Sequence, residues 1–156
     1  DRGPRADIVM DALRGYHSVD IQWGNHDILW MGAASGSRTL VATVLANSIH
    51  YNNLEVIETG YGISLRPLSI FANEVYQNCD THRFAVKLTG EDKEHVSQKD
   101  QLLSARMHKA ITVILFKLEG QKILRHPEYG MEDRLLLDKI DYANRCITIG
   151  GVTYPL

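Results

Sequence analysis

Two short blocks of polar residues near the start of the chain contain the residue types that phosphate chemistry uses. Residues 1–3 read Asp-Arg-Gly, and residues 24–27 read Gly-Asn-His-Asp. Carboxylate, amide and imidazole groups bind manganese, iron or zinc ions. An arginine binds phosphate oxygens through two hydrogen bonds, and a histidine can protonate a leaving oxygen. These residue types in two neighbouring blocks suit hydrolysis of a phosphate ester assisted by two metal ions.

One helix and one strand are predicted between the two blocks. Residues 4–13 place apolar side chains at helical spacing, with Pro4 near the first turn, where its missing N–H costs nothing. Val19, Ile21 and Trp23 alternate with polar residues, a pattern typical of a strand. The second block then follows the carboxyl end of a strand, where open α/β sheets bind ligands. We therefore expect both blocks to meet at one edge of one sheet.

The two blocks resemble the calcineurin-like metallophosphoesterases, whose pattern includes Gly-Asp-x-x-Asp-Arg and Gly-Asn-His-Asp/Glu. Within that superfamily, longer runs resemble the class III fructose bisphosphatases of Firmicutes and related anaerobes, and the resemblance covers nearly the whole chain. These runs are residues 20–34, 51–54, 60–63, 116–121 and 133–140.

The resemblance implies a role for each residue of the blocks. Asp1 matches the aspartate that holds the catalytic histidine in its tautomer, and Arg2 matches the arginine that binds the phosphate. Asn25 matches a metal ligand, and His26 matches the proton donor to the leaving alkoxide. Asp27 stands where serine/threonine protein phosphatases have glutamate, which argues modestly against that branch. The implied activity is that of a gluconeogenic fructose 1,6-bisphosphate 1-phosphatase with two divalent metal ions, manganese being the expected metal.

Most of the metal ligands of the family pattern are absent from these 156 residues. The bridging aspartate and the Asp-x-His block would lie before Asp1, and no Gly-His-x-His occurs. A neutral amide such as Asn25 does not hold a divalent cation alone. We therefore expect a fragment of a longer enzyme that is inactive by itself.

Other interpretations of the blocks stay open. Asp-Arg-Gly-Pro could be an ordinary turn, and Asn25 or Asp27 could simply cap a helix. The chain could also belong to another dinuclear metallophosphatase, either a protein Ser/Thr phosphatase or a dinucleoside polyphosphate hydrolase. A noncatalytic helical binding module is the alternative from a different class.

Beyond the blocks the chain is predicted to be mostly helical, so that the fold class is an α+β fragment. Helices are expected at residues 38–47 and 63–76 and in a long central helix around Leu103 to Leu118, ended by Pro127. The charged residues 89–99 are either a mobile linker or the start of that helix. Residues 131–140 are predicted to form a short helix or turn, and residues 146–154 a β-hairpin around Gly150-Gly151.

This pattern predicts two parts. Residues 1–36 would belong to an α/β metallophosphatase sandwich (αββα), and residues 37–156 would be a helical insertion with a terminal hairpin. The insertion would cap the phosphate site or form a subunit interface in a homo-oligomer. Polar residues that could face the sugar are Arg38, Tyr51, Asn52, Asn53 and Arg66.

Composition adds little to this assignment. The net charge is −2 with mixed signs, so no nucleic-acid surface is indicated, and no long apolar run predicts a membrane segment. The other six histidines lack metal-ligand spacing. Cys79 and Cys146 are too few for a disulfide framework and are expected to be reduced, which fits a cytoplasmic protein.

Overall fold

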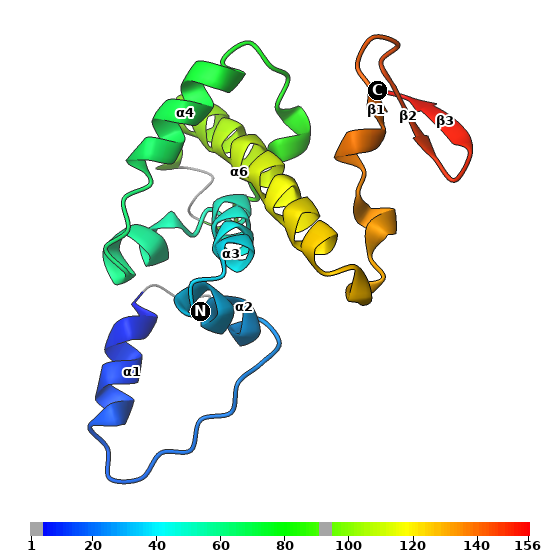
Figure 1. Ribbon diagram of the computed structural model, residues 1–156. Coiled ribbons are helices and arrows are strands. Elements are labelled where there is room, and N and C mark those ends of the chain that lie inside the picture. The colour runs from blue at the N-terminus through cyan, green and yellow to red at the C-terminus, as the bar shows by residue number, and fades with distance from the viewer. Residues whose placement is uncertain (1–4, 91–94) are drawn as a thin grey trace. The chain divides into compact units, whose positions relative to one another are not determined.

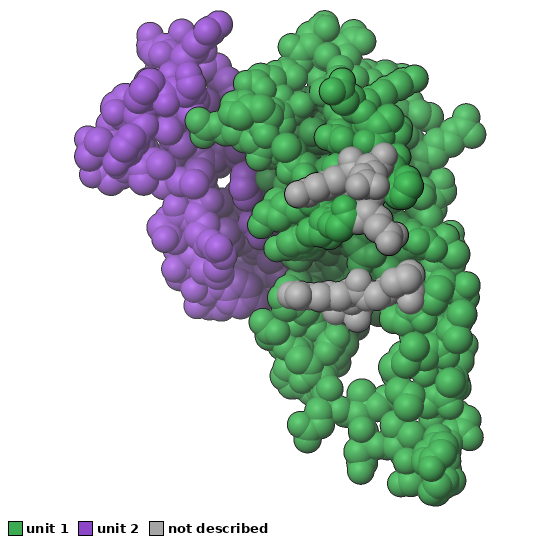
Figure 2. Space-filling view, turned by 180° about the vertical axis from the view of Figure 1, so that it is seen from behind, with its two compact units in different colours: residues 1–113 green, residues 114–156 purple. Residues whose placement is uncertain are grey.

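The computed structural model describes residues 5–90 and 95–156, and it is mostly helical with one small antiparallel sheet (Figure 1). The chain forms two compact units, which we call unit 1 (residues 1–113) and unit 2 (residues 114–156) (Figure 2). None of the helices in the described ranges is both long and apolar enough to cross a membrane.

Unit 1 is built from helices. Its described elements are α1 (Ala6–Arg14), α2 (Asp27–Ala34), α3 (Arg38–His50), the π-helical turn η1 (Val56–Gly60), α4 (Arg66–Tyr76), the 3-10 turn η2 (His82–Phe84) and the first part of α6 (Gln98–Arg125).

Local sequence explains how several of these helices begin. The hydroxyl of Ser37 accepts a hydrogen bond from the N–H of Leu40 at 3.4 Å, so Ser37 is the N-cap of α3. Pro67 lies in the first turn of α4, as predicted. The predicted helices at residues 38–47 and 63–76 are therefore confirmed with shifted ends. Residues 91–94 of the predicted charged linker lie outside the described residues, and Gln98 and Lys99 begin α6.

The core of unit 1 consists of apolar residues contributed by α3, η1, α4 with its N-cap residue, and α6, many of them small enough for helices to approach closely. Arg106 of α6 also donates hydrogen bonds to the side-chain oxygen of Asn73 at 2.7 Å and to the carbonyl of Gln77 at 2.8 Å, which ties the end of α4 to α6. The buried apolar residues are Ala42, Val44, Ala46, Ile49, Val56, Ile57, Leu65, Ala72, Ala105, Met107, Ala110 and Ile111.

Unit 2 contains the end of α6, three 3-10 turns and the sheet. The turns are η3 (Pro127–Tyr129), η4 (Glu132–Arg134) and η5 (Leu137–Lys139). Strands β1 (Ile140–Asp141), β2 (Cys146–Ile149) and β3 (Val152–Pro155) pair in the order β1-β2-β3, all antiparallel. Gly150 and Gly151 both have positive φ, at 57° and 81°, which the tight hairpin turn requires. The predicted hairpin and the predicted turns at residues 131–140 are confirmed.

The strand predicted at residues 19–23 is wrong for this structure. The segment belongs to no strand or helix, and Ile21 and Trp23 are 61% and 62% exposed. A strand exists only when a neighbouring strand accepts its hydrogen bonds, and the strands of the described residues all lie between residues 140 and 155. The predicted division at residue 36 stays a prediction.

Candidate functional site

The four residues predicted to do chemistry are only partly described by the structure. Asp1 and Arg2 lie outside the described residues. Asn25 and His26 are described, and both are exposed at the start of α2. The site can therefore be built upward from the Gly-Asn-His-Asp turn.

This turn is closed by two hydrogen bonds between its first and last residues. The N–H of Gly24 donates to the carboxylate oxygen Oδ2 of Asp27 at 2.6 Å, and the N–H of Asp27 donates to the carbonyl of Gly24 at 3.1 Å. The carboxylate also lies in the first turn of α2, where the helix dipole favours a negative charge. Asp27 therefore has a structural role that fixes the backbone on both sides of Asn25 and His26.

The turn leaves the two middle side chains available. His26 is the N-cap residue of α2, with helical dihedral angles (φ −72°, ψ −28°), and its side chain makes no capping hydrogen bond. The capping alternative for Asn25 or Asp27 is therefore not what the structure shows. Within the described ranges, the side chains of Asn25 and His26 form no hydrogen bond with another residue. An amide and an imidazole are thus presented side by side on a fixed turn.

Helix α2 is held in place by close packing on α3. Gly32 lies against Leu40, so closely that a Cβ atom added to Gly32 would overlap Leu40 Cδ1. On α2 itself, the indole ring of Trp30 stacks on the ring of Tyr61, with centroids 5.2 Å apart and planes at 22°. The turn that carries His26 is therefore anchored through its helix to α3 and to the segment after η1.

Helix α1, which follows the first block, also contacts η1. Arg5 precedes α1 and pairs with Asp7 at 2.9 Å, and this hydrogen bond from the guanidinium lowers the pKa of the Asp7 carboxyl. Gly60, at the end of η1, lies near Asp7: a Cβ on Gly60 would be 3.8 Å from Asp7 Oδ1. Residues 56–61 thus contact the helices that follow both blocks.

The polar residues expected to face the sugar all lie in unit 1, between the start of α3 and the start of α4. Tyr51 is 58% exposed, and the Lys87 ammonium lies 5.4 Å from its ring centroid. Arg38 and Arg66 are the exposed first residues of α3 and α4. Asn52 has a left-handed backbone (φ 54°), and the N–H of Asn53 donates to the carbonyl of Ser48 at 2.7 Å. None of these contacts assigns a functional role.

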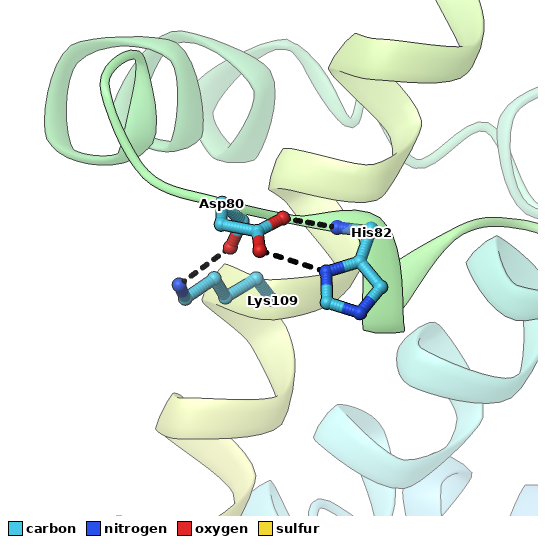
Figure 3. A network of polar contacts seen from close by, with 3 residues as sticks. All are labelled: Asp80, His82 and Lys109. Atoms are coloured by element: carbon cyan, nitrogen blue, oxygen red, sulfur yellow. Dashed lines mark hydrogen bonds and ion pairs between the residues drawn. The ribbon is translucent and has the colours of Figure 1, made fainter. Parts of the chain in front are cut away.

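A polar network that the sequence analysis did not identify joins the segment after α4 to α6 (Figure 3). His82 Nδ1 lies 2.8 Å from Oδ2 of Asp80, and the His82 N–H donates to Asp80 Oδ1 at 2.9 Å. The Lys109 ammonium donates to the Asp80 carbonyl at 3.0 Å. The two hydrogen bonds from His82, first the backbone one, lower the pKa of Asp80.

Asp80-Thr81-His82 has the letters of the Asp-x-His block, but its geometry differs from that of a metal site. The carboxylate and the imidazole contact each other, and the carboxylate also closes a local turn with the His82 N–H. Both side chains are mostly exposed. This network therefore links the segment after α4 to α6. In the sequence, the signal for it is the aspartate two positions before a histidine, at Asp80 and His82.

The described residues do not fit a metal centre on their own. No group of three or more His, Cys, Asp or Glu side chains within residues 5–90 and 95–156 could hold a metal ion. The candidate ligand Asn25 is a neutral amide, which binds divalent cations weakly without carboxylate or imidazole partners. With its own atoms the turn places an imidazole, which can donate a proton, next to an amide, which can supply one oxygen ligand.

Comparison with known proteins assigns the whole chain to one family. The family model for the Firmicute fructose-1,6-bisphosphatases matches residues 1–156. The chain is 54% identical to a class 3 fructose-1,6-bisphosphatase of Clostridium beijerinckii, 56% identical to one of Clostridium tetani and 53% identical to one of Listeria innocua, each over 156 residues. The matches cover 100% of this chain but only 23%, 23% and 24% of these relatives. The chain thus spans about a quarter of their length. No solved structure matches the chain significantly.

Proposed function

The chain belongs to the Firmicute fructose-1,6-bisphosphatase family, and we propose that it works within a longer enzyme that removes the 1-phosphate from fructose 1,6-bisphosphate. The observation that carries this proposal is the match of the family model to the entire chain, together with relatives above 50% identity that bear this name. We refer to a protein of the relatives' length that contains this chain as the full-length enzyme. The full-length enzyme would catalyse the fructose bisphosphatase step of gluconeogenesis.

In this proposal His26 and Arg2 contact the substrate, and Asp1 acts through His26. The imidazole of His26, held on the turn that Asp27 closes, donates a proton to the sugar oxygen as the phosphate leaves. Arg2 binds the phosphoryl oxygens through two hydrogen bonds, and Asp1 orients His26. The exposed position and free side chain of His26 support its part of this scheme.

The dependence on divalent metal, with manganese as the expected ion, is also a proposal. Metal ions of a dinuclear site supply a nucleophile and neutralise charge on the phosphoryl group. Of the described residues, Asn25 is the candidate ligand, so the remaining ligands would come from the rest of the full-length enzyme. The isolated 156-residue chain is accordingly expected to show no turnover.

We further propose that residues 1–36 contribute to an αββα metallophosphatase sandwich and that residues 37–156 form its helical insertion. The exposed alternating residues Val19, Ile21 and Trp23 support this part, because on a paired strand they would share one face, which a second layer of the sandwich could bury. The free thiols of Cys79 and Cys146 suit the reducing cytoplasm. Assembly into a homo-oligomer stays an expectation.

The proposal is tested by assaying the full-length enzyme with fructose 1,6-bisphosphate and Mn²⁺ and identifying the sugar product. Formation of fructose 6-phosphate, abolished by a chelator and restored by Mn²⁺, is the expected result. Formation of fructose 1-phosphate would contradict the proposed position of cleavage, and chelator-resistant turnover would contradict the metal dependence.

A further inference from the structure

The ring pair Trp30 and Tyr61 lies next to the candidate proton donor. Trp30 follows His26 by four residues on α2, and His26 already has helical dihedral angles. Residues at this spacing share one helix face, with Cβ atoms about 6 Å apart. The indole is itself stacked on Tyr61, at a centroid distance of 5.2 Å. The rings of Trp30 and Tyr61 thus form an aromatic surface that begins on the same face of α2 as His26.

Tyr61 is exposed although the residues around it are fixed. Val56 and Ile57 of η1 are 3% and 2% exposed, whereas Tyr61 is 56% exposed. The N–H of Ile63 donates to the Ile57 carbonyl at 3.1 Å, and the N–H of Leu65 donates to Glu58 Oε1 at 3.2 Å. Both hydrogen bonds join residues before Tyr61 to residues after it, so they close the loop that carries the ring.

The backbone conformation of the residue after Tyr61 favours glycine. Gly62 has φ +66°, a conformation that side chains rarely adopt, and nothing lies within 4 Å of where its Cβ would be. A side chain at position 62 would therefore have room, and it is the backbone conformation that favours glycine there. Gly62 therefore sets the backbone beside Tyr61, whose ring is exposed and stacks on Trp30.

We propose that Trp30 and Tyr61 form an aromatic wall that contacts the sugar of the substrate beside His26. This inference rests on the proposed function, since it assigns the sugar-binding part of that same site. Phosphate groups are alike in all phosphomonoesters, so discrimination must come from contacts to the rest of the substrate. Aromatic faces are the usual lining of small-molecule sites, and a flat ring suits the C–H face of a sugar. The wall is a specificity determinant.

Some other rings of unit 1 bury more of their surface than Tyr61 does. Phe84, for example, packs edge-on against His108 and is half-buried. Tyr61 instead uses one face against Trp30 and leaves more than half of its surface open. Its position between the helices that follow both blocks is what distinguishes it from other exposed tyrosines, because η1 contacts α1 while Tyr61 contacts α2.

The experiment compares Tyr61→Leu, Tyr61→Phe and a matched control in the full-length enzyme. The control is Tyr129→Leu, because Tyr129 is 50% exposed and likewise stacked on another ring, that of His126 at 5.0 Å. Two quantities are measured: kcat/KM for fructose 1,6-bisphosphate, and the inhibition constant of inorganic phosphate, which reports the phosphate site without the sugar.

The expected result is a fall of about tenfold in kcat/KM for Tyr61→Leu, mainly through KM, with an unchanged inhibition constant for phosphate. Tyr61→Phe, which keeps the ring, should lose less kcat/KM than Tyr61→Leu, and Tyr129→Leu should stay within about twofold of the wild type in kcat/KM. An unchanged kcat/KM for Tyr61→Leu would overturn the proposal. Equal losses in kcat/KM and in phosphate binding would also overturn it, because they would indicate a structural role.

Two further outcomes keep the test decisive. If Tyr61→Leu does not fold, Trp30→Phe takes its place, since it keeps an aromatic ring in the stack but shortens the wall; KM should rise about threefold, and an unchanged KM would overturn the proposal. If the wild-type enzyme does not hydrolyse fructose 1,6-bisphosphate, the proposed function itself fails. Activity of the wild type with an unaffected Tyr61→Leu variant rejects the aromatic wall alone.

Discussion

The carboxylate of Asp27 accepts a hydrogen bond from the N–H of Gly24 at 2.6 Å, while the N–H of Asp27 donates back to the Gly24 carbonyl at 3.1 Å. This reciprocal pair makes the Gly-Asn-His-Asp sequence a closed turn at the start of α2. These two hydrogen bonds explain an acidic residue at the fourth position without a role in the reaction. A carboxylate there accepts a hydrogen bond from the turn backbone and is stabilised by the dipole of α2.

Replacing Asp27 should therefore lower activity without removing any reacting group. Asp27→Ala in the full-length enzyme is expected to reduce kcat about tenfold, because misplacing a catalytic group by a fraction of an ångström is costly. Asp27→Asn, whose side-chain oxygen can still accept from Gly24, should lose less. Steady-state kinetics on both variants would check this order, and an alanine variant as active as the asparagine variant would contradict it.

Local sequence signals were sufficient for the elements whose causes are local. Helical spacing located α3 and α6, Pro67 marked the first turn of α4, and Gly150-Gly151 marked the hairpin turn. The Gly24–Asp27 pair is also local, three residues apart, and could have been inferred from a carboxylate in a first helical turn.

Local sequence patterns did not predict features that depend on a distant part of the chain. The alternating residues 19–23 carry a strand pattern, but pairing depends on another segment, and the described residues supply none. The contact of Trp30 with Tyr61 joins positions 31 residues apart, and nothing in either run of residues predicts that their rings meet. Roles for Asn25 and His26 came from family resemblance, whereas their exposure came from the structure.

Because α2 packs closely on α3, the effect of Gly32→Ala on stability should depend on the side chain at position 40. Gly32→Ala should destabilise the enzyme by about 1 kcal/mol, because the added methyl group would overlap Leu40 and the overpacking outweighs the gain in helix propensity. In a Leu40→Ala background the overlap is gone, and the same substitution should stabilise by about 1 kcal/mol.

A double-mutant cycle on the free energy of unfolding, measured by denaturant titration of the full-length enzyme, would test this coupling. Gly15→Ala is a suitable control, since its Cβ would meet only backbone oxygens at 3.5 and 3.8 Å. Identical effects of Gly32→Ala in both backgrounds would show that Leu40 is not the obstacle.

The histidine pair between α3 and α6 predicts a loss of stability in acid. His50 and His108 have ring centroids 5.0 Å apart, and Lys87 donates its N–H to the His50 carbonyl at 2.7 Å. Burial first, then the charges of His108 and Lys87, lower the pKa of His50 in the folded chain. As the pH falls below the ordinary value of about 6.5, the unfolded chain takes up a proton that the folded chain resists, so stability decreases.

The loss of stability in acid that His50 causes should disappear in His50→Gln, because glutamine does not titrate. The fall in Tm of the full-length enzyme between pH 7.5 and pH 5.5 is expected to be smaller in the variant than in the wild type. Above about pH 7 the two proteins should show the same dependence on pH, because His50 is then neutral in both states. A variant that loses as much stability in acid as the wild type would refute this origin.

The proposed role of His26 predicts a large and specific loss of turnover. His26→Asn in the full-length enzyme should reduce kcat by about 10² or more, the usual scale for a lost general acid. Because the His26 side chain makes no hydrogen bond within the described part of the chain, its Tm should stay close to that of the wild type. Near wild-type kcat would exclude His26 as the proton donor.

The central claim, that this chain belongs to a sugar bisphosphatase, is tested most directly by a substrate comparison. The full-length enzyme would be offered fructose 1,6-bisphosphate, a phosphopeptide and a dinucleoside tetraphosphate in parallel with Mn²⁺, and phosphate release would be measured for each. For the nucleotide, alkaline phosphatase would be added after the reaction, because it releases phosphate from the nucleoside phosphates formed and not from the intact dinucleoside tetraphosphate. Strong preference for fructose 1,6-bisphosphate is the predicted result. Preference for either other substrate would contradict the assignment to sugar phosphates, and no turnover of any of them would favour a noncatalytic binding module.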